Sequence, residues 1–534
     1  MSEYNLNGLV IPLFMFFMAI EYIFLRLKGK NLHRYNDSVN SLSMGMCLLI
    51  SDALLKTFTF AAYMYLWENH RSLDFSIQEP ITWVVFFFVL DLCYYAFHRA
   101  AHEINFLWGA HVGHHQSEEY NLTTALRQSA FQYAFSWVFY LPLAFLGCPP
   151  QVFLILFILL KLYQFGLHTQ AINKVPLIEG IFSTPSSHRV HHAKNPVYID
   201  RNYGGTLAIW DRIFGTWQPE LAQEPCHYGT TLPLNTLNPI KANLQHWEML
   251  AKDTVKTASW HNKFILWFKP TGWRPRDCIK GDGSTSKLQS SGSTNIVKYD
   301  PQVSNLVKIY TAINFLLLIA ITVMFLFMSP KLSALMLILG TFTVVYGFVA
   351  ISHFLEGSKS LTFFELIRLP VTFWLASNLW FSTSTTQIIN TIVMDKPAAQ
   401  ALSYASSPGL WPDWHPQSSK VYVRSSQPLI KGDTFEEDIQ TFLGKNHLSW
   451  KVIQSTNDTW IAEANNQTNG STIRLQYQVR ALGNKSEFER TLHYTMPNFA
   501  LVTVNALFFK SKVEQKSADA LLRLKNAVNE QFTY

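Results

Sequence analysis

Three short rows of histidine are the residues of this sequence best suited to chemistry. They are His98-x-x-x-His102, His111-x-x-His114-His115 and His188-x-x-His191-His192. Histidine accounts for 18 of 534 residues, so three windows of five residues would hold roughly half a histidine by chance. The rows hold eight histidines, and composition does not explain them.

The spacing within each row indicates a shared direction. On an α-helix, positions i and i+4 lie on one face, and positions i, i+3 and i+4 fall within an arc of about 100°. Neutral imidazole binds Zn, Fe, Cu and Ni, and eight ring nitrogens are too many for one tetrahedral ion. The rows therefore predict two metal ions, although a single histidine would be better explained as solvated or hydrogen-bonded in a core.

Composition places the chain in a membrane. Hydrophobic residues make up 49% and charged residues 15%, whereas soluble proteins carry about 25% charged residues. The net charge of +7 is not concentrated in a run, which fits loops at a membrane surface and gives no indication of nucleic acid. The five cysteines show no paired spacing, so we expect neither a disulfide framework nor a thiolate metal site.

Apolar runs position the histidine rows. The first, Leu9–Leu25, lacks a basic start and is followed by four basic residues, so we expect a retained anchor rather than a signal peptide. The positive-inside rule then places the amino terminus outside and the following loop in the cytoplasm. The next run, Leu42–Trp67, would cross the membrane outward, and Ile81–Phe97 would cross it back. This places His98 and the metal site on the cytoplasmic side. The membrane would be the bacterial inner membrane or, in a eukaryote, the endoplasmic reticulum.

Asp91 lies within the third run, two helical turns before His98. A carboxylate in an apolar segment is costly and is usually paired or functional. We predict that Asp91 takes part in the active site by orienting a ligating imidazole. A hydrogen bond to Tyr94 or Tyr95 is the alternative.

Two further runs, Phe131–Leu146 and Val152–Leu167, are joined by a Gly-Cys-Pro-Pro turn. Two crossings would return the third row to the same side as the second. The runs are short for full spans, so a shallow re-entrant hairpin with the same sidedness is the alternative. His168 ends the second arm, and we predict that it is a ninth metal ligand.

The remaining chain up to residue 383 is expected to form a cap and accessory helices. The polar segment 116–130 is dense in hydrogen-bonding side chains, and residues 169–306 predict a cytoplasmic cap. Within that cap, the aromatic-rich composition of residues 202–217 predicts an amphipathic stretch in the headgroup layer. The composition of residues 280–295 predicts a flexible linker. Three more apolar runs follow, at 309–328, 332–352 and 361–381, the last with Glu365 and Arg368 one turn apart.

Beyond residue 383 the pattern is typical of a soluble α+β domain. Alternating segments predict strands at 387–394, 419–424, 433–439, 449–454, 458–463, 471–482 and 486–494. A helix-like piece at 397–405 and a final helix at Ala518–Gln531 complete an antiparallel sheet gripping a helix. We therefore expect a mainly α, polytopic membrane bundle with a histidine-rich cap (1–300), accessory transmembrane helices (301–383) and an α+β helix-grip domain (384–534).

The three rows resemble those of the fatty acid hydroxylase and sterol desaturase superfamily of membrane di-iron enzymes. Residues 98–129, 188–217 and the F-K-P-T-G-W-R-P element at 268–275 are more narrowly similar to the alkylglycerol monooxygenase family. This resemblance covers about residues 1–300. Residues 384–534 resemble polyketide cyclase and START-like helix-grip domains, which enclose apolar ligands.

The resemblance implies an O₂-dependent monooxygenase with two iron ions and tetrahydrobiopterin. It would hydroxylate the carbon beside the ether oxygen of a membrane lipid, and the hemiacetal would separate into a glycerol derivative and a fatty aldehyde. The family's metal-site residues correspond here to His98, His102, His111, His114, His115, His188, His191 and His192. The resemblance also makes Glu103 a required residue, whereas the electron donor is not fixed by the sequence.

Two other interpretations stay open at this point. A hydroxylase or desaturase of a sterol, fatty acyl chain or carotenoid would use the same site with another electron donor. Glu103 and the polar run at 118–128 favour the ether-lipid enzyme over it. A lipid-binding or transport protein with structural zinc is the alternative from another class, and the metal content separates it from an enzyme.

Overall fold

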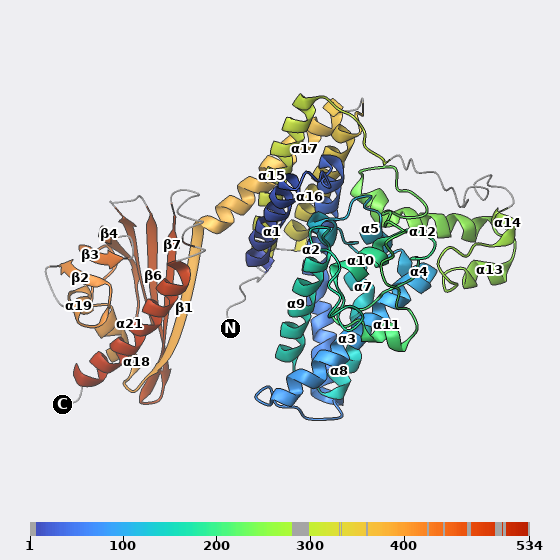
Figure 1. Cartoon of the computed structure of the whole chain (residues 1–534). Helices are drawn as coiled ribbons and strands as arrows, with labels where there is room; N and C mark the ends of the chain where they lie inside the picture. The colour runs from blue at the N-terminus through green and yellow to red at the C-terminus, as the bar shows by residue number, and fades with distance from the viewer. Residues whose placement is uncertain are drawn as a thin grey trace. The chain divides into compact units, whose positions relative to one another are not determined.

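The computed structural model describes residues 7–279, 298–329, 332, 334–358, 361–423, 427–441, 444–466, 471–496, 505 and 509–531. The chain divides into two compact units, Met1–Leu375 and Ala376–Tyr534. The first is helical and the second is built on one sheet (Figure 1). The linker expected over 280–295 lies outside the described residues.

Five helices of the described chain are long and apolar enough to cross a membrane. They are α2 (Tyr35–His70), α3 (Pro80–Glu103), α9 (Pro150–Leu167), α15 (Asn305–Met328) and α16 (Ala334–Leu355). The other two long apolar runs are also helical, as α1 (Asn7–Leu27) and α17 (Leu361–Ser384). With 36 residues, α2 is about 54 Å long, which exceeds the bilayer core of about 30 Å. We infer that α2 extends beyond the bilayer into the cap, where its first half is largely buried.

Helix α1 is fixed by a buried carboxylate. Glu21 accepts hydrogen bonds from the backbone N of Leu122 at 2.8 Å and from the hydroxyl of Thr169 at 2.5 Å. The ring of Phe14 stacks on that of Phe165, with centroids 4.2 Å apart. The acidic residue of the first apolar run therefore docks α1 beside the end of α9.

The apolar hairpin forms, but its first arm is broken into short pieces. These are α7 (Gln132–Ser136), a 3₁₀ turn η1 (Trp137–Tyr140) and α8 (Leu141–Leu146). Gly147 follows with φ of +97°, and a Cβ there would lie 1.9 Å from the carbonyl oxygen of Leu73. Only glycine fits this turn, and Pro150 then begins α9.

The cap consists of short helices between and after these spans. They are α4 (Asn105–Trp108), α5 (Val112–His115), α6 (Leu122–Leu126), α10 (Pro185–His192), α11 (Ile209–Ile213), α12 (Pro239–Lys256), α13 (Trp260–Ile265) and α14 (Arg276–Ile279). Helix α10 shows why such short elements form here. Thr184 and Ser187 form a capping box at its start, and Pro185 occupies the first turn, which satisfies backbone N–H groups and presets φ.

Glu365 and Arg368, which lie one turn apart in α17, form an ion pair. The guanidinium of Arg368 donates to Glu365 at 2.7 and 2.8 Å and to the side-chain oxygen of Asn314 in α15 at 2.7 Å. The two charges therefore bind α17 to α15.

The second unit is an antiparallel sheet of seven strands in the order β1-β7-β6-β5-β4-β3-β2. Its strands are β1 (Thr385–Met394), β2 (Ser418–Tyr422), β3 (Thr434–Thr441), β4 (Gly444–Ser455), β5 (Thr459–Asn466), β6 (Thr472–Leu482) and β7 (Lys485–Thr495). The short elements α18 (Ala398–Ala405), η3 (Pro408–Leu410) and α19 (Trp411–Trp414) follow β1, and α21 (Lys510–Gln531) ends the described chain. Every predicted strand is present.

One apolar core joins this sheet to its helices. Trp411, Trp450 and Trp460 are buried together with Leu521 and Leu524 of α21. The helix-grip arrangement predicted from the sequence is therefore confirmed. Helix α21 begins eight residues before the predicted Ala518. The sequence did not indicate this earlier start, because residues 510–517 are polar apart from Val513 and carry no apolar stripe.

Candidate metal centre

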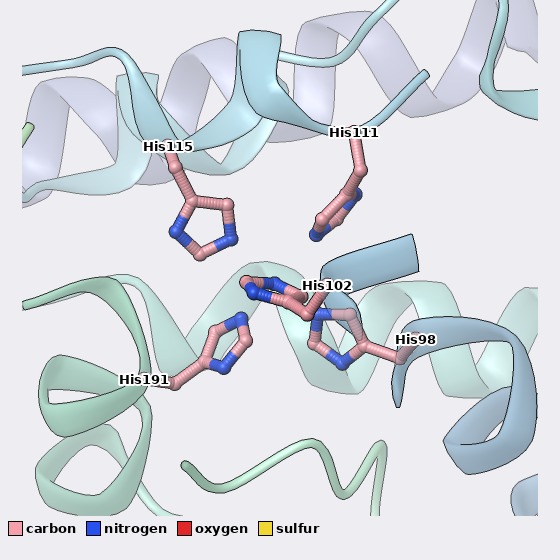
Figure 2. Close-up of side chains that lie close together, drawn as sticks. All are labelled: His98, His102, His111, His115 and His191. Atoms are coloured by element: carbon pink, nitrogen blue, oxygen red, sulfur yellow. The ribbon is translucent and has the colours of Figure 1, made fainter. Parts of the chain in front are cut away.

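Nine buried histidines gather at the end of α3 in two groups. One contains His98, His102, His111, His115 and His191, and the other contains His114, His168, His188 and His192. Within each group, one ring nitrogen from every residue lies within 4.8 Å of the others. Figure 2 shows the five rings of the first group pointing toward one another. The structure thus brings together all nine histidines singled out in the sequence, including His168.

The rows divide between the groups by helical position. Residues i and i+4 of each row share a group, as in His111 with His115 and His188 with His192. The i+3 residue of each three-histidine row, His114 or His191, belongs to the other group. This division follows from the 100° step between neighbouring helical residues. Helices α5 and α10 therefore each contribute to both groups, and His168 completes the second.

Hydrogen bonds to backbone carbonyls fix which ring nitrogen is free. The Nδ1 atoms of His98, His114, His168 and His191 lie 2.8, 2.7, 2.8 and 3.0 Å from the carbonyl oxygens of Tyr203, Arg127, Gln164 and Arg201. A carbonyl oxygen can only accept, so Nδ1 must carry the proton. In a neutral ring the Nε2 lone pair then remains available to a metal.

The free nitrogens face one another without partners. The Nε2 atoms of His98, His102, His111, His115, His191 and His192 are buried and have no hydrogen-bond partner within the described chain. In the second group, Nε2 of His168 lies 3.2 Å from Nε2 of His114. Both carry lone pairs, so they cannot bond each other without a cation. The donor set therefore fits metal ions.

Burial keeps the rings neutral. It lowers the pKa of His111 and His168 to about 3 and that of His191 to about 4. Burial, and then neighbouring imidazoles, hold the pKa of His114 and His192 well below the usual range. Metal ligands must be deprotonated, so these histidines are ready to bind at neutral pH.

Asp91 does not make the contacts expected from the sequence. Its carboxylate accepts hydrogen bonds from the backbone N of Thr206 at 2.7 Å, the backbone N of Leu207 at 3.0 Å and the indole N–H of Trp210 at 3.0 Å. The described hydrogen bonds of Asp91 thus include neither Tyr94 nor Tyr95, which makes the alternative wrong, and they include no imidazole, so any orienting role of Asp91 is indirect. Asp91 instead holds the loop that follows Tyr203.

A second carboxylate holds the same loop from the other side. Asp211 accepts from the backbone N of Tyr203 at 2.7 Å and of Gly204 at 2.8 Å. A Cβ at Gly205 would lie 2.9 Å from Asp91, so the loop needs glycine there. The carbonyl that orients His98 is therefore set by two buried acids. Sequence reasoning did not single out Tyr203 or Asp211. The N-Y-G-G element at 202–205 and the W-D-R element at 210–212 contain them and could have pointed to both.

Glu103 lies outside both groups. Its side chain is 44% exposed and accepts from Arg99 at 2.9 Å. A different carboxylate approaches the first group: Oδ1 of Asp200 lies 3.7 Å from Nδ1 of His102. The structure gives Glu103 no ligand position, and its role remains a prediction.

Arg127 is a further residue of the site, within the polar segment after the second row. Its guanidinium is buried and donates to the carbonyl oxygen of Gly113 at 2.7 Å and to Asn40 and Gln116. Its own carbonyl accepts from His114. Arg127 therefore connects α2 to the second histidine row.

Comparison with known proteins gives two family matches. Residues 83–216 match the fatty acid hydroxylase family, and residues 385–529 match the family described as polyketide cyclase/dehydrase and lipid transport. The first match includes all nine histidines of the centre. Among solved structures, the Zhui aromatase/cyclase from Streptomyces sp. R1128 aligns with 10% identity and a TM-score of 0.24, covering 28% of this chain and 95% of that one.

Two curated relatives match a longer part of the chain than either family match does. An alkylglycerol monooxygenase of Xenopus tropicalis is 43% identical over 296 residues, 55% of this chain and 65% of that protein. The alkylglycerol monooxygenase of Homo sapiens is 37% identical over 358 residues, 67% of this chain and 79% of that protein. The ornithine lipid hydroxylase OlsE of Rhizobium tropici is 26% identical over 222 residues, which are 39% of this chain and 63% of that protein.

Proposed function

This chain belongs to the alkylglycerol monooxygenase family, and from that premise we propose that it hydroxylates an ether lipid with O₂ and two iron ions. Oxygen would be inserted at the carbon beside the ether oxygen, and the resulting hemiacetal would separate into a fatty aldehyde and a glycerol derivative. The observation that carries the proposal is the pair of buried imidazole groups with facing lone pairs at the end of an apolar helix.

The bound iron would supply the oxidising power that an unactivated C–H bond requires, which redox-inert zinc lacks. The residues of the chain position the ions and keep water away. Nine neutral imidazoles provide the donors, and carbonyl partners on Nδ1 fix four of the rings. None of the nine histidines is more than 5% exposed, which favours exclusion of bulk water.

The position of the centre supports a lipid substrate. The apolar helix α3 leads directly from Pro80 to His98 and His102. A lipid could therefore present its ether-linked carbon at the metal groups while its alkyl chain stays among apolar side chains. The basic residues at the end of α1 and just after it, Arg26, Lys28 and Lys30, support a cytoplasmic location for this end of the bundle.

Each turnover needs two electrons and two protons besides O₂, because one oxygen atom enters the product and the other leaves as water. We propose tetrahydrobiopterin as the donor. The family resemblance noted in the sequence supports this donor.

Hydroxylation of an acyl lipid without cleavage is the second candidate, favoured by the similarity to the ornithine lipid hydroxylase. The test uses purified full-length protein loaded with iron, an alkylglycerol, and an ester lipid of equal chain length. We expect fatty aldehyde from the alkylglycerol, dependent on added tetrahydrobiopterin and abolished in His114→Ala.

Other outcomes of this assay separate the remaining interpretations. A hydroxylated ester lipid with no aldehyde from the ether would support the second candidate. Purified protein that contains zinc and consumes no O₂ with either lipid would exclude both enzymes.

A further inference from the structure

Helix α13 and the turn after it expose a row of large aromatic side chains. Trp260, Phe264 and Phe268 are 74%, 68% and 75% exposed. The first two lie one turn apart on α13, and Phe268 lies in the turn that follows the helix. Together with Phe106 and Trp267 they line an apolar groove. Soluble surfaces rarely leave a contiguous apolar patch open, and such patches mark interaction sites.

This aromatic row is fixed to the end of α3. The backbone N of Phe106 donates to the carbonyl of Trp267 at 2.8 Å, and that of Asn105 donates to the carbonyl of Lys269 at 3.0 Å. The hydroxyl of Thr271 donates to the carbonyl of His102. Because α3 is an apolar helix that can span the membrane, its end marks the boundary of the bilayer. In Figure 1, α13 lies to the side of α3, where a surrounding leaflet would meet it.

The charges around the row are suited to an anionic surface. Residues 252–276 contain six lysines and arginines and a single acidic residue, Asp253. That carboxylate is buried and bonded to Arg274 at 2.6 Å. The ammonium of Lys263 lies 5.5 Å from the ring centroid of Trp260, and that of Lys269 lies 5.9 Å from the ring centroid of Trp273. Cations placed among exposed aromatic rings are typical of helices that lie in the headgroup layer.

We propose that residues 260–268 form an interfacial anchor that binds the anionic leaflet of the surrounding bilayer. The three exposed aromatic side chains enter the headgroup and upper acyl region, and the neighbouring lysines contact lipid phosphates or carboxylates. The anchor holds the segment bonded to His102 and Asn105 at a fixed depth. It does not depend on the reaction proposed above, since it follows from exposure, charge and attachment to α3 alone.

The first test measures depth in the bilayer with a fluorophore. Phe264→Cys is introduced into a full-length chain whose five native cysteines are replaced by serine, labelled with bimane and reconstituted into nanodiscs. Lipids brominated on the acyl chain should quench this label at least about twofold. Glu248→Cys on α12 is the matched control, because this acidic side chain is paired with Lys241 and Lys252 and should face water, with little quenching.

A second test uses the unmodified full-length chain and does not depend on the cysteine replacements. Hydrogen exchange of peptides covering 255–269 should slow severalfold when anionic lipid replaces zwitterionic lipid in the nanodisc. Lys256→Glu together with Lys263→Glu should remove this difference.

An unquenched label at position 264, or exchange that is insensitive to lipid charge, would overturn the proposal. Energy transfer between labelled copies in place of lipid quenching would assign the face to a second copy of the chain, which also overturns it.

Discussion

The Nε2 atoms of His114 and His168 lie 3.2 Å apart, although His114 lies in α5 and His168 follows α9, and each ring donates its Nδ1 proton to a carbonyl. Two lone pairs at this distance repel each other unless a cation lies between them. His168 lies outside the three rows, yet it occupies the position that completes the second group. Its contribution can be measured separately from theirs.

His168→Ala should reduce the iron content from about two to about one ion per chain and lower turnover at least 100-fold. The second group would keep only three imidazoles, whereas the first would stay complete. Elemental analysis and aldehyde formation are the measurements. His246→Gln is the control, because His246 is buried but donates to the carbonyl of Asn105 and belongs to neither group. Unchanged iron in His168→Ala would remove His168 from the ligand set.

Asp91→Asn should weaken iron retention by about 10- to 100-fold without unfolding the protein. The variant replaces one acceptor oxygen by an amide NH₂, so at least one of the three donors from Thr206, Leu207 and Trp210 loses its partner. The loop that sets the Tyr203 carbonyl against His98 would then loosen. Titration with a chelator, followed by iron absorbance, measures the effect. Asp211→Asn should act in the same direction, and wild-type retention in both variants would contradict this positioning role.

Glu103→Gln should leave the free energy of unfolding within about 1 kcal/mol of wild type, because an exposed i,i+4 pair such as that with Arg99 contributes little. If the requirement implied by the family resemblance holds, turnover should nevertheless fall more than about 10-fold. Thermal unfolding and aldehyde formation on one preparation compare the two effects. Arg99→Gln breaks the same ion pair and is the control. An equal loss of turnover in Arg99→Gln would assign the effect to the pair rather than to Glu103.

The second unit should lose stability as the pH rises from about 4.5 to about 7. Burial raises the pKa of Glu437 to about 7, and the indole N–H of Trp450 donates to its carboxyl at 2.9 Å. The folded unit therefore binds more protons than the unfolded chain between its unfolded pKa of about 4.5 and its folded pKa, so ΔG of unfolding falls over that range and then levels off.

Hydrogen exchange of peptides from β3 and β4, corrected for the intrinsic dependence on pH, measures this effect. Glu437→Gln should flatten the profile, whereas Glu436→Gln, at the exposed neighbouring position, should keep it. A profile in Glu437→Gln with the wild-type slope would mean that another group is responsible.

The sequence predicted the fold closely where periodicity carries information. Apolar runs became helices, and each alternating segment after residue 383 became a strand, because both patterns reflect burial of one face. The first hairpin arm was predicted less well. Its composition is apolar apart from Gln132 and Ser136, but a 3₁₀ turn at 137–140 separates α7 from α8, and Pro142 lies in the first turn of α8.

Eight of the nine histidines could be found from spacing, and His168 from its place at the end of an apolar run. Their division between two groups could not be found from either signal. Which residue joins which group depends on how α3, α5, α9 and α10 meet, and no local pattern encodes that packing. Asp91 was singled out for its cost in an apolar helix, but its partners come from residues 115 to 119 positions later. Such long-range contacts between a loop and a helix carry no periodic signal.

Helices α5 and α10 each give histidines to both groups. In each of these two rows, three residues within about one helical turn reach both groups, so the spacing between the groups follows the pitch of the backbone rather than the reach of one side chain. If each group held an ion, substituting one histidine would change what that ion binds, whereas an insertion within α5 or α10 would be needed to change how far apart the ions stand.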